Sequence, residues 1–83
     1  MTHFDHKNSG TCSMMVSFDL DGDVVRNVKY MGGCDGYLKA IGILVEGMKA
    51  EDVIAKLEGN KCGRRNTSCA DQLAQALKEA LAQ

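Results

Sequence analysis

The chain has 83 residues, of which 45% are hydrophobic and 25% are charged, and its formal net charge at pH 7 is −1. These values are typical of one small globular domain and argue against a disordered segment. A net charge so close to zero supplies no general attraction for nucleic acid or for an anionic membrane, so neither is expected as a partner. No apolar run is long enough to span a bilayer.

Residues 1–10 differ in character from the rest of the chain, because Phe4 is their only clear apolar anchor. We expect a flexible N-terminal tail over residues 1–10 and a single four-cysteine domain over residues 11–83. His3 and His6 are interpreted as solvated side chains of this tail, although histidine can also bind a metal. The segment contains no apolar stretch typical of a signal peptide, so we expect a cytoplasmic protein.

A β-hairpin is predicted next, because apolar residues recur at every second position from 14 to 20. The sequence "DGD" at 21–23 is expected to turn the chain, and "VVRNVKYM" to return as the second strand. A two-residue turn would place Val16 opposite the polar Asn27, whereas a three-residue loop places it opposite Val28. Because directly opposed residues share a face of the sheet, we expect the three-residue loop.

Three amphipathic helices are predicted after the hairpin. The first begins near Asp35, a good N-cap residue, and stops at Gly47. The second covers "AEDVIAKLEG" and ends at Gly59, and the third begins near Ser68 or Cys69. The helix positions expected to face the core are Leu38, Ile41, Leu44, Val45, Met48, Val53, Ile54, Leu57, Leu73, Ala76, Leu77, Ala80 and Leu81.

The predicted fold class is therefore α+β, with an N-terminal β-hairpin packed against three helices in the order ββααα. Gly42 interrupts the first helix, and we expect it to permit close packing rather than to hold a ligand. Only two strands are visible, and an isolated pair leaves edges that proteins usually cover. We therefore expect a homodimer, formed along a strand edge or through the apolar side of the first helix.

Four cysteines in a reducing compartment indicate metal binding or redox chemistry rather than permanent disulfides. The hairpin register places Cys12 opposite Gly32, two residues before Cys34, so these two thiols are expected to be neighbours. Cys34 precedes one predicted helix and Cys69 opens another, and a helix start favours the thiolate form. The loop from Cys62 to Cys69 is long enough to turn both sulfurs toward one point. The spacing lacks a CxxC pair, so buried cysteines remain an alternative to a tetrahedral site for zinc or iron–sulfur chemistry.

The segments "GGCDGYLKAI", "LVEGMKAEDVIAKLEG", "KCG" and "TSCADQLAQAL" resemble the TSCPD-domain family, and the resemblance extends from Cys12 to Leu81. Members of this family occur alone and at the C-terminal end of some ribonucleotide reductases, where their four cysteines are regarded as metal ligands. The proline of the family motif is replaced by alanine in this chain. The motif reads Thr67, Ser68, Cys69, Ala70 and Asp71.

This resemblance implies a function for the cysteines. It implies that Cys12, Cys34, Cys62 and Cys69 bind a metal, with zinc as the expected ion. It also implies an accessory role in deoxynucleotide synthesis, with ribonucleotide reductase as the protein partner. The chain is too short to contain the catalytic barrel of the reductase, so we do not expect it to be catalytic alone.

A more distant resemblance connects the chain with NifU-type iron–sulfur scaffold proteins. In those proteins one cysteine precedes a hairpin, another follows it in a "GC" turn, and a third opens a late helix, an order that Cys12, Cys34 and Cys69 reproduce. Ser68 stands where the scaffold has a histidine, and Cys62 is an additional sulfur that would close the site. The alternative function is therefore an iron–sulfur scaffold or thiol-redox protein, with an iron–sulfur or redox protein as its partner.

Overall fold

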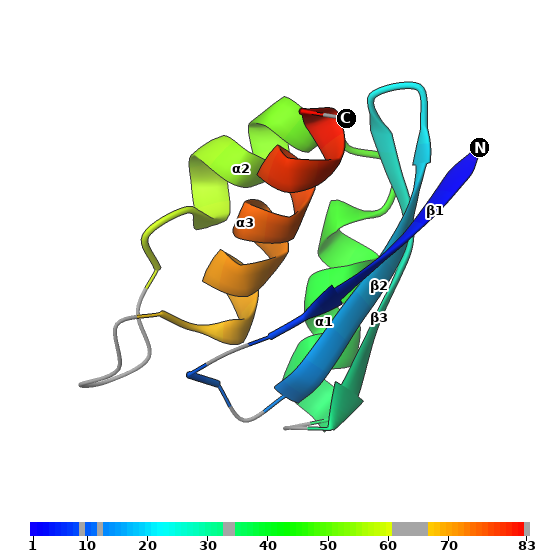
Figure 1. Cartoon of the computed structure of the whole chain (residues 1–83). Helices are drawn as coiled ribbons and strands as arrows, with labels where there is room; N and C mark the ends of the chain where they lie inside the picture. The colour runs from blue at the N-terminus through cyan, green and yellow to red at the C-terminus, as the bar shows by residue number, and fades with distance from the viewer. Residues whose placement is uncertain (9, 12, 33–34, 61–66, 83) are drawn as a thin grey trace.

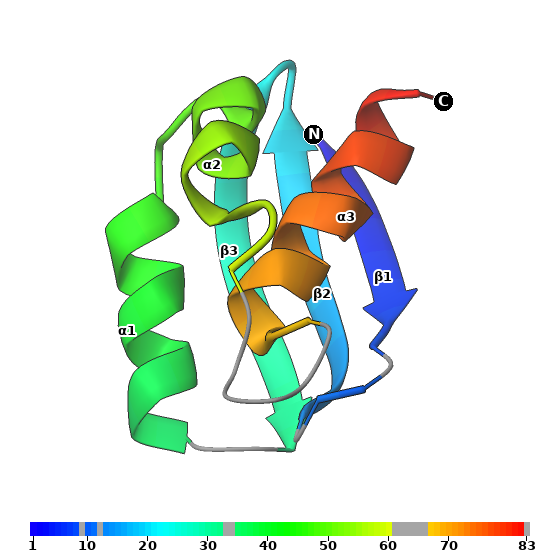
Figure 2. The same ribbon diagram turned by 90° about the vertical axis from the view of Figure 1, so that its left-hand side faces the viewer.

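The computed structural model describes residues 1–8, 10–11, 13–32, 35–60 and 67–82. A three-stranded antiparallel sheet of order β1-β2-β3 is covered on one face by helices (Figure 1, Figure 2). This arrangement confirms the predicted α+β fold, in which antiparallel strands are followed by three helices. None of the helices in the described ranges is long and apolar enough to cross a lipid bilayer. The elements are β1 (Thr2–Lys7), β2 (Ser13–Asp21), β3 (Val24–Gly32), α1 (Asp35–Val45), α2 (Ala50–Leu57) and α3 (Cys69–Leu81).

Strand β1 corrects the prediction of a tail over residues 1–10, because it pairs antiparallel with β2 over its whole length. The rings of Phe4 and Phe18 stack with their centroids 5.6 Å apart. His6 is half-buried, and its Nδ1 lies 3.3 Å from Oε2 of Glu79 in α3. An edge strand with one solvated face carries few apolar residues and is held largely by backbone pairing. Its composition therefore resembles that of a tail.

The turn between β2 and β3 has two residues, Gly22 and Asp23, because Asp21 lies opposite Val24. The predicted three-residue loop over 21–23 is therefore wrong. Gly22 has a φ angle of 64°, a left-handed conformation that glycine adopts without a steric penalty. Tight two-residue hairpin turns require such a conformation.

A β-bulge in β3 explains why the alternation misled the prediction of the register. The pairing with β2 shifts by one residue around Asn27, which has a φ angle of 56°. Val25 is in the core on one side of this bulge, whereas Val28 and Tyr30 pack against the core on the other side. The apolar pattern of "VVRNVKYM" changes phase at Asn27, and asparagine tolerates the left-handed region better than most residues.

The hydrophobic core lies between the sheet and the inner sides of the helices. The helix positions predicted to face the core are buried or packed against it, with two exceptions. Leu44 is 74% exposed and Leu81 is 41% exposed. Leu44 faces away because α1 lies along β3 at one edge of the sheet and contacts it through its opposite side (Figure 2). The largest fully buried side chains are Phe18, Leu73, Leu77, Val16, Val25 and Val53.

Gly42 lies on the side of α1 that packs against β3. A Cβ atom at this position would be 2.9 Å from the backbone oxygen of Val28, which is closer than real Cβ contacts allow. The prediction that this glycine permits close packing is therefore confirmed.

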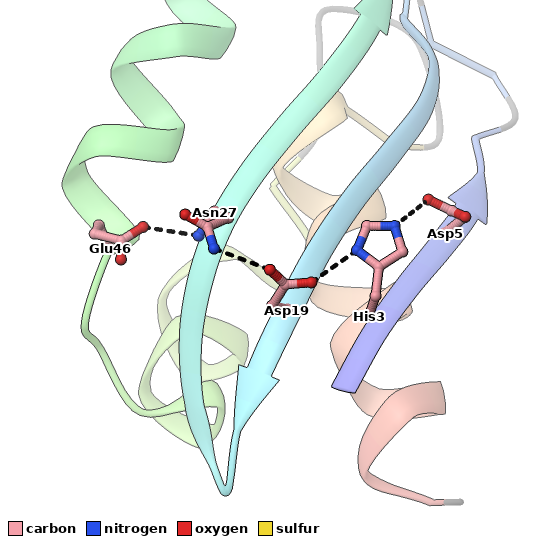
Figure 3. Close-up of polar contacts among 5 residues, drawn as sticks. All are labelled: His3, Asp5, Asp19, Asn27 and Glu46. Atoms are coloured by element: carbon pink, nitrogen blue, oxygen red, sulfur yellow. Dashed lines mark hydrogen bonds and ion pairs between the residues drawn. The ribbon is translucent and has the colours of Figure 1, made fainter. Parts of the chain in front are cut away.

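A row of polar side chains crosses the face of the sheet opposite the helices (Figure 3). His3 Nδ1 is 2.7 Å from Asp19 Oδ1, and His3 Nε2 is 2.9 Å from Asp5 Oδ1. Asn27 Nδ2 donates to Asp19 Oδ2 at 2.9 Å, and the Asn27 backbone N–H donates to Glu46 Oε1 at 2.8 Å. The row therefore connects β1, β2, β3 and the residue that follows α1. His3 is exposed to solvent as expected, but it lies in a strand rather than in a tail, and its ring is held by two carboxylates.

The charge state of His3 follows from its two partners. Both ring nitrogens face carboxylate oxygens, which can only accept hydrogen bonds, so both nitrogens are satisfied only in the imidazolium form. The hydrogen bond to Asp19, with a further one to Asp5, raises the pKa of His3 above its ordinary value. The hydrogen bond from Asn27, with a further one from His3, lowers the pKa of Asp19.

We expect the substitution Gly42→Ala to lower the free energy of unfolding by roughly 1–3 kcal/mol, because the new methyl group must push α1 away from Val28. Gly36→Ala in the same helix is the matched control, since a Cβ there would have no neighbour within 4 Å. The control should be neutral or stabilising by up to about 1 kcal/mol. Urea unfolding of the two variants measures both values, and equal stabilities would contradict the packing argument.

The His3 network should make the stability of the protein depend on pH. The raised pKa of His3 adds stability that is fully present below 6.5, the ordinary value, and is lost as the pH rises through the raised pKa. The lowered pKa of Asp19 adds stability that is present above 3.8 and is lost as the pH falls further. Thermal unfolding should therefore show the largest difference between the wild type and His3→Gln between these two values. A difference that stays constant up to alkaline pH would contradict this expectation.

Candidate functional site

Cys69 lies at the first residue of α3, as predicted, where the helix meets one end of the sheet. Cys69 is half-buried, and its Sγ atom lies 2.9 Å from Oγ of Ser13, the first residue of β2. Its backbone oxygen accepts a hydrogen bond of 2.8 Å from the hydroxyl of Tyr30 in β3. The end of β1, the start of β2 and the end of β3 lie together at this end of the molecule (Figure 2).

Ser13 reaches Cys69 because the pairing of β2 with β3 is irregular at this end. A register shift lies between Ser13 and Met15. Regular alternation would turn Met14 toward the core, as the sequence predicted, but Met14 is 67% exposed and Ser13 is only 3% exposed. Bulges next to functional sites commonly redirect a side chain in this way. The sequence analysis did not identify Ser13 as a site residue. A polar residue next to Cys12, just before the alternating apolar positions of the strand begin, is a signal that could have indicated it.

Asn8 is a second residue of this site that the sequence did not indicate. It follows β1, it is 8% exposed, and its Nδ2 donates to Ser13 Oγ at 2.8 Å. Its Oδ1 is buried without a hydrogen-bond partner in the described part of the chain. The hydroxyl of Thr11 donates to the backbone oxygen of Ser13 at 2.9 Å. The Ser13 hydroxyl that contacts the sulfur of Cys69 is therefore itself held by the side chain of Asn8, and the hydroxyl of Thr11 bonds to the backbone of Ser13.

The residues beside Cys69 connect the start of α3 to the residues after α2. The Ser68 hydroxyl caps α3 by accepting from the backbone N–H of Asp71 at 3.0 Å, and it donates to the backbone oxygen of Asn60. Asp71 Oδ1 accepts from the backbone N–H of Gly59 at 2.7 Å, and Oδ2 accepts from the hydroxyl of Thr67. Ser68 and Asp71 therefore link the residues just before the 61–66 segment, Gly59 and Asn60, to those just after it.

Two nearby groups have shifted pKa values. Burial alone raises the pKa of Asp71, but hydrogen bonds from Thr67, Gly59 and Gln75 together lower it below its ordinary value. Burial raises the pKa of the Tyr30 phenol, and the charge of Cys69 raises it further. Tyr30 therefore acts here as a neutral hydrogen-bond donor.

Only Cys69 of the four predicted metal ligands belongs to the described residues, so the convergence of the four sulfurs stays a prediction. Within the described ranges, no three His, Cys, Asp or Glu side chains are grouped in a way that could hold a metal ion. The other predicted ligands, Cys12, Cys34 and Cys62, lie outside the described residues.

The described neighbours of Cys12 and Cys34 nevertheless meet at this site. Gly32, two residues before Cys34, lies opposite Ser13, which follows Cys12 and contacts Cys69. The predicted pairing of Gly32 with Cys12 is therefore wrong by one residue, because the hairpin turn has two residues rather than three. The bulge at Asn27 and the irregularity between Ser13 and Met15 shift the register in opposite directions and cancel. The prediction that Cys12 and Cys34 are neighbours itself lies outside the described residues.

We expect Asp71→Asn to lower the free energy of unfolding by about 1–3 kcal/mol at neutral pH, since a buried hydrogen-bonded carboxylate is replaced by a neutral amide. The lowered pKa of Asp71 means that its contribution is present above 3.8 and is lost as the pH falls through the lowered value. The two proteins should therefore converge in stability in acid. Asp21→Asn, at an exposed position, should change stability by less than about 0.5 kcal/mol. Urea unfolding at several pH values tests both statements.

The comparison with known proteins bears on this end of the molecule. No significant match was found among curated proteins or among solved structures. Residues 1–81 match the family model described as the TSCPD domain. The match includes β1 and the motif residues 67–71 as well as all four cysteines. The chain therefore belongs to the TSCPD domain family.

Proposed function

We propose that this chain is a small metal-binding module in which four thiolates hold one ion, with zinc as the expected metal. The observation that carries this proposal is the position of Cys69, whose Sγ lies at a helix start 2.9 Å from the Ser13 hydroxyl. Helix N-termini and hydrogen-bond donors both favour thiolate, the form of cysteine that binds metals. The ligands of this site would be Cys12, Cys34, Cys62 and Cys69.

The lengths of the chain segments support one shared site for the first two cysteines and Cys69. Consecutive Cα atoms are about 3.8 Å apart, so Cys12 is within one such step of Ser13 and Cys34 within two steps of Gly32. Ser13 and Gly32 are paired, and Ser13 contacts Cys69. The sulfurs of a tetrahedral zinc site lie about 4 Å apart, which these short connections allow.

The connections to Cys62 support the same site. This cysteine follows Asn60 by two residues, and Asn60 accepts a hydrogen bond from Ser68, the residue before Cys69. Asp71 holds the neighbouring Gly59 at the same place. These two bonds keep the described residues before Cys62 next to the start of α3.

A zinc ion bound by four cysteines would have a structural role, because no coordination position remains open for a substrate. Such an ion would connect the start of β2, the segment between β3 and α1, and the segment before α3. Structural zinc contributes folding free energy directly, on the order of 10 kcal/mol in well-formed sites. A domain of 83 residues gains little folding free energy from its core alone, so a bound metal would supply a large part of its stability.

We further propose that the module is an accessory domain associated with ribonucleotide reductase and deoxynucleotide synthesis in the cytoplasm. The support for this role is the resemblance to TSCPD domains that accompany ribonucleotide reductases, together with the match of residues 1–81 to the TSCPD family. The outer side of α1 supports a protein partner or a second copy of the chain, because Tyr37, Ile43 and Leu44 are each at least 74% exposed. The alternative function is an iron–sulfur scaffold or thiol-redox protein, for which a half-buried thiol at a helix start is equally suited.

Metal analysis of protein purified with and without oxygen separates the two functions. We expect a colourless protein with about one zinc per chain, since four thiolates close a tetrahedral site. Cys69→Ser and Cys34→Ser should lose the metal and lower the melting temperature, and Cys62→Ser should do so less if water replaces its sulfur. A brown protein that contains iron and bleaches in air would contradict zinc and support the iron–sulfur alternative.

A further inference from the structure

The hydroxyl of Ser13 has a defined direction of donation. The Asn8 Nδ2 group can only donate, so at 2.8 Å it occupies Ser13 Oγ as an acceptor. The hydroxyl hydrogen of Thr11 is directed to the backbone oxygen of Ser13 at 2.9 Å. The hydrogen of Ser13 has two acceptors within reach, Cys69 Sγ at 2.9 Å and Thr11 Oγ1 at 3.5 Å, and the shorter contact is the one to the sulfur. A thiolate cannot donate, so with Cys69 in that form the bonds run from Asn8 to Ser13 and from Ser13 to the sulfur.

Two unfavourable features accompany this arrangement. The irregular register at the start of β2 leaves the side chain of Met14 67% exposed. The Oδ1 atom of Asn8 is buried without a partner in the described part of the chain, which costs desolvation free energy. The exposure of Met14 accompanies the burial of Ser13, and Asn8 is the residue that donates to the Ser13 hydroxyl. Local departures from good packing and good hydrogen bonding are concentrated at functional sites.

We infer that Asn8 and Ser13 are positioning residues that hold Cys69 Sγ as a hydrogen-bond acceptor and thereby raise the metal affinity of the site. This inference rests on the proposed metal-binding function. Ser13 acts on the sulfur directly, whereas Asn8 acts through Ser13 by fixing the direction of its hydroxyl. Groups that hydrogen-bond to metal ligands commonly set affinity in this way, and their loss costs about 10–100-fold in metal affinity.

The test compares Ser13→Ala with Ser17→Ala. Both substitutions remove a serine hydroxyl from β2, but Ser17 lies between the buried Val16 and Phe18 and therefore faces the opposite side of the sheet. Zinc affinity is measured by competition with a chromophoric chelator, and cobalt is bound in parallel because its absorption spectrum reports the thiolate ligands. Ser13→Ala should bind zinc about 10–100-fold more weakly than the wild type and shift the cobalt spectrum. Ser17→Ala should do neither.

Asn8→Ala keeps the side chain of Ser13 and provides a second test if Ser13→Ala does not fold. It should weaken zinc binding in the same direction. The double variant should be no weaker than Ser13→Ala alone, because residues that act through one another are not additive. Additive losses would contradict the relay.

The wild type distinguishes a failure of this inference from a failure of the proposed function. A wild-type protein that binds neither zinc nor cobalt overturns the proposed function and, with it, the effect of the relay on affinity. A wild type that binds zinc, with equal affinities for Ser13→Ala and Ser17→Ala, overturns the relay alone. NMR of the metal-free protein gives an independent readout, since the side-chain amide signals of Asn8 should shift in Ser13→Ala but stay in place in Ser17→Ala.

Discussion

The start of α3 is the point on which the rest of the structure depends. The hydroxyl of Ser68 fixes it by accepting from the backbone N–H of Asp71 and donating to Asn60. Once the helix begins there, Leu73 and Leu77 fall in the core against β2. The same start places Cys69 at the end of the sheet, beside the first residue of β2. One capped helix end therefore serves both the packing of the domain and the position of its described thiol.

Strand β1 contributes to the structure at both of its ends. Near the hairpin turn, His3 lies between Asp19 and Asp5 on the outer face of the sheet (Figure 3). At the other end, Asn8 follows the strand and holds Ser13 next to Cys69. Between these ends the strand is held by backbone pairing with β2 and by the stacking of its one phenylalanine. Strand β1 has few apolar residues, yet it completes one edge of the sheet. Asn8, which follows it, forms one side of the candidate site.

The two irregularities in the sheet have different consequences. The bulge at Asn27 keeps the apolar residues of β3 on the core side despite a change of phase in the sequence. It also places the backbone N–H of Asn27 where Glu46 accepts from it. The irregularity near Met14 instead exposes an apolar side chain and buries Ser13. The first preserves the core, whereas the second serves the surroundings of Cys69.

The sequence by itself determined the antiparallel hairpin, the three helices and their ends, because periodicity, capping residues and glycines act over a few neighbouring positions. Gly47 and Gly59 follow their helices with positive φ angles, as such local signals indicate. Only the tertiary structure decided the pairing of β1, the two register shifts and the contact of Ser13 with Cys69. These features depend on contacts between residues that are far apart in the sequence. A short segment of sequence does not determine which of the alternative strand pairings has the lowest free energy.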